Sequence, residues 1–222
     1  MLRKTSITTL LLLSFSTPAW CHGFYIGLGG GPEIVNFKQT SFVNDGILGG
    51  FDVKNLSHPA GSGLFGSLFG GYAWTRNQYY LAGEANIDIS SVDARSENDE
   101  YLHKNFSHTD LKMQHAYGFS LLPGCMVTNT TLFYGRVGYT NSNLKISTNE
   151  STLANINTRL NGLRLGLGIN QTFDKNFSGR FEYDHSSYQN AKFTVVDGAV
   201  TKATTINPQA DQVEFAVIYS FA

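Results

Sequence analysis

Apolar and polar residues alternate along the chain in segments of about ten residues, the length that a tilted strand needs to cross a bilayer. In residues 78–90 the odd positions from Tyr79 to Ile89 are apolar or glycine, whereas Glu84, Asn86 and Asp88 lie at even positions. This period of two indicates a strand rather than a helix, whose period is 3.6. The pattern predicts eight strands, at residues 24–33, 63–74, 78–90, 112–127, 131–146, 159–173, 177–189 and 213–221.

The connections between these segments alternate in length. Short polar breaks lie at 75–77, 128–130 and 174–176, and long polar connections at 34–62, 91–111, 147–158 and 190–208. Short periplasmic turns and long extracellular loops are typical of outer-membrane barrels. The sequence therefore predicts an all-β fold: an eight-stranded antiparallel up-and-down transmembrane β-barrel with both termini in the periplasm. Residues 195–200 are expected to form a hairpin around Asp197-Gly198.

Aromatic residues concentrate beside the short breaks and at the end of the chain. Amphipathic aromatics at a membrane boundary keep their apolar bodies in lipid and their polar edges in water. We therefore expect an aromatic girdle at the height of the short turns, formed by Trp74, Tyr79, Phe133, Tyr134, Phe173, Phe177, Tyr219 and Phe221.

The polar faces of the predicted strands carry charges of both signs. A basic side chain facing lipid at mid-bilayer costs about 2–4 kcal/mol, so these groups are expected to point inward. Eight strands enclose a space only wide enough for side chains, which favours a filled interior, with a narrow ion channel as an alternative. The predicted interior polar network is Glu84, Asp88, Arg136, Arg164, Arg180, Glu182, Asp184 and Glu214.

Composition supports a single barrel domain. The 222 residues include 16 Lys and Arg against 17 Asp and Glu, giving a net charge of −1 that predicts no nucleic-acid partner. Charged residues make up only 15%, which suits lipid-facing strands. The alternative reading is a soluble periplasmic ligand-binding barrel whose apolar faces line a cavity. No metal or cofactor is expected.

The first 21 residues are typical of a signal peptide, and residues 22–222 form the predicted barrel domain. Leu2-Arg3-Lys4 is the basic region, followed by an apolar run at Leu10–Phe15 that is too short to span a bilayer. Cleavage is expected after Cys21. Lipidation of Cys21 is the alternative, although Trp20 stands where a lipoprotein signal has a small residue.

One pair of residues suggests an enzymatic alternative. His185 and Ser187 lie two apart on a predicted strand, so they share its lipid-facing side and could act as base and nucleophile. This arrangement is similar to that of outer-membrane lipid A deacylases, with Asp197 or Glu214 as candidate acidic partners. Because the sequence does not identify which residue orients the base, the constellation is incomplete and the leading expectation is that the chain is not an enzyme.

Two stretches carry a family resemblance. Residues 121–139 and Phe181–Tyr188 resemble strands of OmpA-like and opacity-type outer-membrane barrels, although Ala222 follows the Phe221 that ends the usual assembly signal. The resemblance implies insertion by the outer-membrane assembly machinery and a surface-antigen or adhesin role. It also implies that the barrel contacts outer-membrane lipid and lipopolysaccharide, and that its loops bind a host-surface or extracellular ligand.

Overall fold

The computed structural model describes residues 23–45, 49–53, 60–98, 107–148, 156–197 and 200–221. In these ranges no helix is long and apolar enough to cross a membrane. The predicted signal peptide lies outside the described residues. The strands are β1 (Gly23–Asp45), β2 (Gly49–Val53), β3 (Ala60–Arg76), β4 (Tyr79–Ser90), β5 (Asp93–Asn98), β6 (Ser107–Met126), β7 (Thr131–Thr148), β8 (Ile156–Thr172), β9 (Phe177–Tyr188), β10 (Ala191–Asp197) and β11 (Val200–Ser220).

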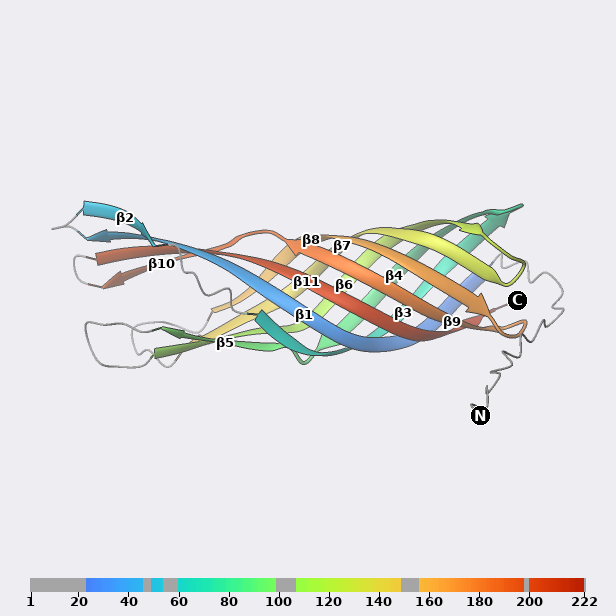
Figure 1. The fold of residues 1–222 in the computed structure, drawn as a ribbon, viewed down its shortest axis with the longest axis horizontal. Coiled ribbons are helices and arrows are strands. Elements are labelled where there is room, and N and C mark those ends of the chain that lie inside the picture. Colours follow the sequence, from blue (N-terminus) through green and yellow to red (C-terminus); the bar gives the residue numbers. More distant parts are fainter. Residues whose placement is uncertain are drawn as a thin grey trace, which may run out of the picture.

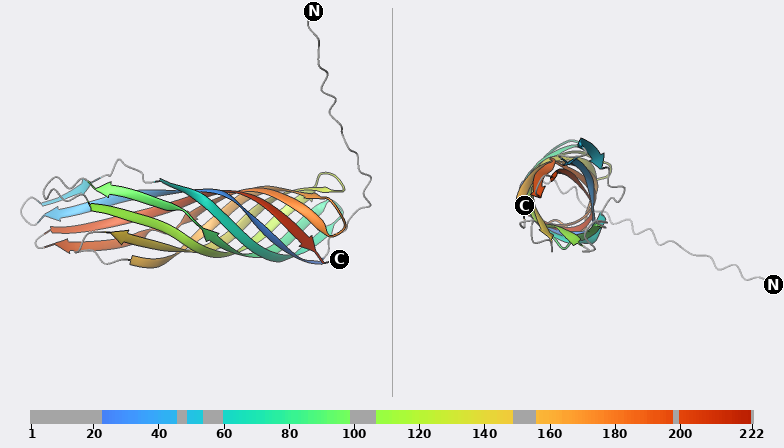
Figure 2. Two further views of the ribbon diagram at one scale, coloured as in Figure 1. Left: turned by 90° about the horizontal axis from the view of Figure 1, so that it is seen from below. Right: turned by 90° about the vertical axis from the view of Figure 1, so that its left-hand side faces the viewer.

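Eight strands close into a ring in which each one is antiparallel to its neighbours. Their order is β1, β3, β4, β6, β7, β8, β9 and β11, and β11 pairs again with β1. The end-on view of Figure 2 shows the closed ring. Strands β2, β5 and β10 extend the wall by pairing with β1, β6 and β11 respectively. The predicted eight-stranded up-and-down barrel is therefore confirmed.

Tight turns join the strands at one end of the barrel, here called the proximal end. Residues 77–78, 127–130 and 173–176 make these turns, close to their predicted positions. Asn77 has a φ of 57°, a left-handed conformation that asparagine tolerates better than most residues. Strand β1 begins and β11 ends at this same end (Figure 1).

The opposite, distal end departs from the prediction. We expected β1 to end at residue 33 and the last strand to begin at 213, but the β1–β11 pairing continues from Tyr25↔Ser220 to Asp45↔Val200. The prediction of long loops is therefore wrong for much of the described chain. The inward face keeps its period of two beyond the lipid-facing segment, whereas the outward face becomes polar there. Because of these polar outward positions, the sequence of this segment resembles that of a loop.

The predicted hairpin at residues 195–200 is confirmed in its strands. Strand β10 pairs with β11 up to Asp197↔Val200. The turn between them, residues 198–199, lies outside the described residues. This pairing belongs to the distal extension of the wall.

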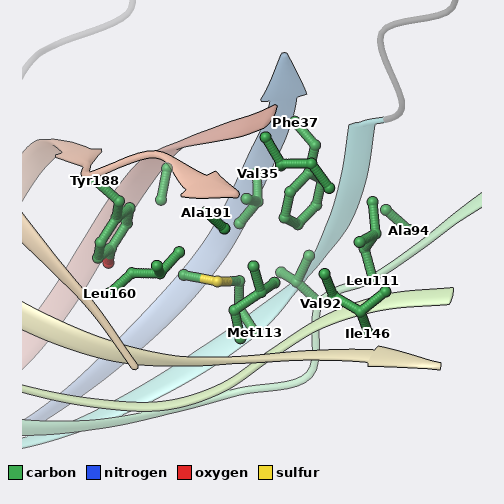
Figure 3. Packing of buried hydrophobic residues seen from close by; sticks show 13 residues of the cluster. Val35, Phe37, Val92, Ala94, Leu111, Met113, Ile146, Leu160, Tyr188 and Ala191 are labelled. Atoms are coloured by element: carbon green, nitrogen blue, oxygen red, sulfur yellow. The ribbon is translucent and has the colours of Figure 1, made fainter. Parts of the chain in front are cut away.

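Two apolar clusters fill the barrel at different heights. The distal core, shown in Figure 3, is drawn from eight of the strands and the β4–β5 link. Its buried members are Val35, Phe37, Val92, Ala94, Leu111, Met113, Leu144, Ile146, Leu160, Tyr188, Ala191, Ile206 and Ala210. The proximal core comprises Tyr25, Phe69, Ala73, Ala82, Leu122, Leu132, Tyr134, Ala216 and Ile218.

The order of residues along each strand places a charged layer between these cores. On β7, Tyr134 of the proximal core precedes Arg136, and Leu144 of the distal core follows. On β11, Ala210 precedes Glu214 and Ala216 follows it. The interior is therefore layered as apolar, charged and apolar, and the charged layer is its chemically distinctive part.

Candidate functional site

The inward-facing charges form the first candidate site. All eight residues predicted for the interior are buried, none more than 5% exposed. Period two explains this arrangement, because Arg180, Glu182 and Asp184 alternate with the outward-facing Phe181 and Tyr183 on β9. The strand pattern thus delivers the charges to one enclosed space.

Glu84 is the centre of this network. Its two carboxylate oxygens accept hydrogen bonds from Arg136 Nη2 at 2.6 Å and from Arg180 Nη1 and Nη2 at 3.1 and 2.8 Å. Tyr25 donates its hydroxyl to Glu84 Oε2 at 2.8 Å. The guanidinium of Arg180 also lies 4.3 Å from the ring centroid of Phe69 in the proximal core. Glu84 therefore links two buried cations that come from different strands.

The remaining arginine contacts extend the network toward the distal end. Arg136 Nε lies 2.8 Å from Glu182 Oε1, an ion-pair contact without hydrogen-bond alignment. Tyr134 donates its hydroxyl to the other oxygen of Glu182. Arg164 Nη2 donates to Asp88 Oδ2 at 2.9 Å. Each arginine is therefore neutralised by at least one carboxylate.

Sequence reasoning missed one buried acid, Glu33. It accepts hydrogen bonds from Ser90 Oγ and from Gln212 Nε2, the latter at 3.0 Å. Glu33 is the last residue of its predicted strand. Val35 and Phe37 continue the same inward-facing alternation, and this is the signal that could have placed Glu33 inside. Among the described residues the interior then holds six carboxyl groups (Glu33, Glu84, Asp88, Glu182, Asp184, Glu214) and three guanidinium groups (Arg136, Arg164, Arg180).

Glu214 is the least well held of these acids. Its Oε1 is buried without a hydrogen-bond partner, and it lies directly across the strand pair from Glu182. Like charges facing each other across two strands are destabilising. Glu84 and Glu214 are thus matched in residue type and burial but opposite in their surroundings.

The outer surface of the barrel carries an exposed apolar band. Seven of the eight residues predicted for the aromatic girdle are exposed, with Phe177 against Tyr219 and Tyr219 against Phe221 at ring-centroid distances of 5.2 and 5.1 Å. The placement of Tyr134 in the girdle was wrong, since it is buried in the proximal core. Adjacent strand residues face opposite sides, so Phe133 and Tyr134 cannot both point outward.

This arrangement also overturns the reading of the chain as a soluble barrel lined by apolar residues. At the height of the apolar band, charged side chains such as Glu84 and Arg180 point inward, and large apolar side chains such as Leu28, Leu68 and Ile87 point outward. Exposing an apolar band of this kind to water is unfavourable, so the band requires a lipid environment.

A second group of functional side chains lies on the outward face near the distal edge of the band. His185 Nδ1 lies 2.8 Å from Asp211 Oδ1, and Tyr183 donates its hydroxyl to the same oxygen at 2.7 Å. Glu214 was a wrong candidate for the acidic partner because it points inside. The side chain of Asp197 lies outside the described part of the chain. Nothing in the sequence indicated Asp211, because the register of β9 against β11 must be known first.

The interior is packed closely enough to depend on glycine at defined positions. A Cβ at Gly168 would lie 2.3 Å from the Tyr134 hydroxyl oxygen, whereas a Cβ at Gly66 would meet nothing within 4 Å. Gly168→Ala is expected to destabilise the barrel by about 1–3 kcal/mol, the usual cost of overpacking, whereas Gly66→Ala should leave stability unchanged. Urea unfolding in lipid vesicles measures both, and equal stabilities would contradict this packing.

A closed barrel with a charged interior and an exposed apolar band defines an integral membrane β-barrel. The family model "Outer membrane protein beta-barrel domain" matches residues 7–221, and the chain belongs to this family. It is thus an outer-membrane protein of the Gram-negative type.

The chain is also similar to solved structures of outer-membrane proteins at low sequence identity. OprG from Pseudomonas aeruginosa is 11% identical with a TM-score of 0.57, the match covering 92% of this chain and 100% of OprG. Neisserial surface protein A is 11% identical with a TM-score of 0.49, covering 90% and 97%. The outer membrane protease OmpT from Escherichia coli is 10% identical with a TM-score of 0.48, covering 94% and 99%. Among curated proteins none matches. The likeness to OprG extends to the fold alone.

Proposed function

We propose that the chain is a surface protein of adhesin or antigen type whose distal extension presents a binding face outside the cell. The observation that supports this is strand length. β1 has 23 residues and β11 has 21, whereas a tilted strand crosses a membrane in about 9–11 residues. About half of each strand therefore lies beyond the lipid. These strands are longer than membrane insertion requires.

The proposed orientation places the proximal turns and both termini in the periplasm. Short turns on that side and extended structure outside are the usual arrangement in outer-membrane barrels. Lipid and lipopolysaccharide then surround the apolar band, the assembly machinery inserts the chain from the periplasmic side, and a host-surface or extracellular ligand meets the distal end. The three-layered interior favours this role over a narrow ion channel.

Paired charges cover part of the distal surface. Arg95 Nε lies 2.8 Å from Asp110, and Lys112 Nζ lies 2.7 Å from Asp93. The hydrogen bond to Asp93 raises the pKa of the Lys112 ammonium, so Lys112 stays charged at neutral pH. Because these charges cancel, the face they cover suits a partner of no strong net charge.

Cysteine labelling in intact cells tests the orientation. In a Cys125→Ser background, Lys38→Cys places a thiol on the exposed distal part of β1 and Asn129→Cys places one in a proximal turn. A membrane-impermeant maleimide should label the first variant in intact cells and both variants after permeabilisation. Labelling of the Asn129 variant alone in intact cells would reverse the proposed topology.

A further inference from the structure

Three side chains with complementary chemistry share the outward face of β9 and β11. His185 and Ser187 lie two apart on β9, so they project to the same side. Asp211 lies opposite His185 in the β9–β11 register and contacts its Nδ1. The side chains of His185 and Asp211 are 41% and 32% exposed, so both can be reached from outside the barrel.

The contact with Asp211 fixes the tautomer of the neutral imidazole. An ionised carboxylate only accepts hydrogen bonds, so the short contact with Asp211 places a proton on His185 Nδ1. The other ring nitrogen, Nε2, is then free to accept a proton. Tyr183 donates to the same oxygen of Asp211 and so acts as a positioning residue. The histidine is oriented as a general base whether or not a ligand is present.

The surroundings of this group indicate the substrate. On its β8 side, Leu163 lies opposite Ser187 and Leu165 lies opposite His185. Both leucines are exposed members of the apolar band. On its β11 side, Gln209 lies opposite Ser187 and carries amide N–H groups. A substrate held there has an apolar chain against β8 and a polar group beside Ser187, as an acyl ester of a membrane lipid does.

We propose that Ser187, His185 and Asp211 form a serine-hydrolase site that removes ester-linked acyl chains from lipids of the outer leaflet. This inference goes beyond the proposed display function and does not depend on it. The site needs neither a distal partner nor the distal core.

The reaction balances with water as its only co-reactant. Ser187 Oγ attacks the ester carbonyl carbon while its proton passes to His185 Nε2. The bond to the lipid alcohol breaks, and His185 returns the proton to that oxygen, leaving an acyl-serine. Water, deprotonated by His185, then attacks the acyl carbon. The bond to Ser187 Oγ breaks, His185 returns the proton to that oxygen, and the fatty acid leaves. Gln209 is placed to donate a hydrogen bond to the carbonyl oxygen as it becomes negative.

The experiment uses the full mature chain refolded in vesicles that contain lipopolysaccharide and diacyl phospholipid. Mass spectrometry measures the fatty acid released from each lipid. Ser187→Ala and Asp211→Asn are expected to lower the rate on the order of 10³–10⁴-fold. Ser62→Ala, which alters an exposed serine on β3, should leave it unchanged. Mobility on unheated gels verifies that each variant is folded.

A fluorophosphonate probe separates catalysis from a structural role. Folded wild-type protein should be modified at Ser187, and the His185→Asn variant should lose that modification while its gel mobility stays the same. Absence of both fatty acid release and probe modification in the folded wild type would overturn the proposal. Release that persists in Ser187→Ala would overturn it as well.

Discussion

Replacing Glu84 with glutamine is expected to destabilise the folded barrel by about 3–5 kcal/mol, the usual cost of breaking a buried ion pair from one side. The change leaves the guanidinium of Arg180, which bonds both oxygens of Glu84, in the interior without that carboxylate. Arg136 keeps its contact with Glu182, so the loss falls mainly on Arg180. Urea unfolding of the protein in lipid vesicles, followed by mobility on unheated gels, gives the free energy.

Glu214→Gln is the matched control for this prediction. It removes a carboxylate that is equally buried but has an unpartnered oxygen and faces Glu182 across the strand pair. Losing that repulsion should leave stability unchanged or slightly raise it. If both substitutions cost the same, the network would depend on burial alone and not on which carboxylate meets an arginine.

Replacing Phe37 with alanine is expected to cost about 3–5 kcal/mol, the usual range for truncating a fully buried aromatic ring. Phe37 is 0% exposed in the distal core, whereas Phe42, on the same strand, is 45% exposed. The damage should be local, because the charged layer and the proximal core hold the lipid-embedded part independently. Elements that depend on a separate core can open without global unfolding.

Limited proteolysis and hydrogen exchange in lipid vesicles locate this effect. Phe37→Ala should expose the distal parts of β1, β10 and β11 to protease while the proximal half stays protected. Phe42→Ala should behave as wild type. Cleavage or exchange spread evenly over the barrel would mean that the distal core and the membrane-embedded part unfold as one unit.

The period of two predicted the strand number and the inward charges, and the alternation of short and long connections predicted the antiparallel order. An ionised side chain cannot face lipid cheaply, so each charged position assigned the face of its strand without knowledge of neighbouring strands. Glu84, Arg136 and Arg180 were placed correctly for this reason. Tyr134 was misplaced because the girdle was inferred from clustering along the chain, which disregards the face on which each residue lies.

The features that sequence reasoning missed depend on how strands pair. Asp211 meets His185 only because the β9–β11 register aligns them across a long connection. Glu33 faces the interior because β1 continues past its lipid-facing segment, in which the outward positions are apolar. The outward-facing positions are apolar only where they face lipid. The full length of β1 can therefore be recognised only from its inward-facing apolar residues, Val35 and Phe37.

The extended wall of β1 and β11 would set how far the proposed binding face stands from the cell. About 12 of the 23 residues of β1 lie beyond the lipid, and with about 3.3 Å per residue and a tilt of about 40° they rise about 30 Å. The β1–β11 ladder, which is paired continuously to Asp45↔Val200, would act as a stiff pedestal and not as a flexible tether. A partner would meet it at a fixed stand-off distance, without first having to order a flexible chain.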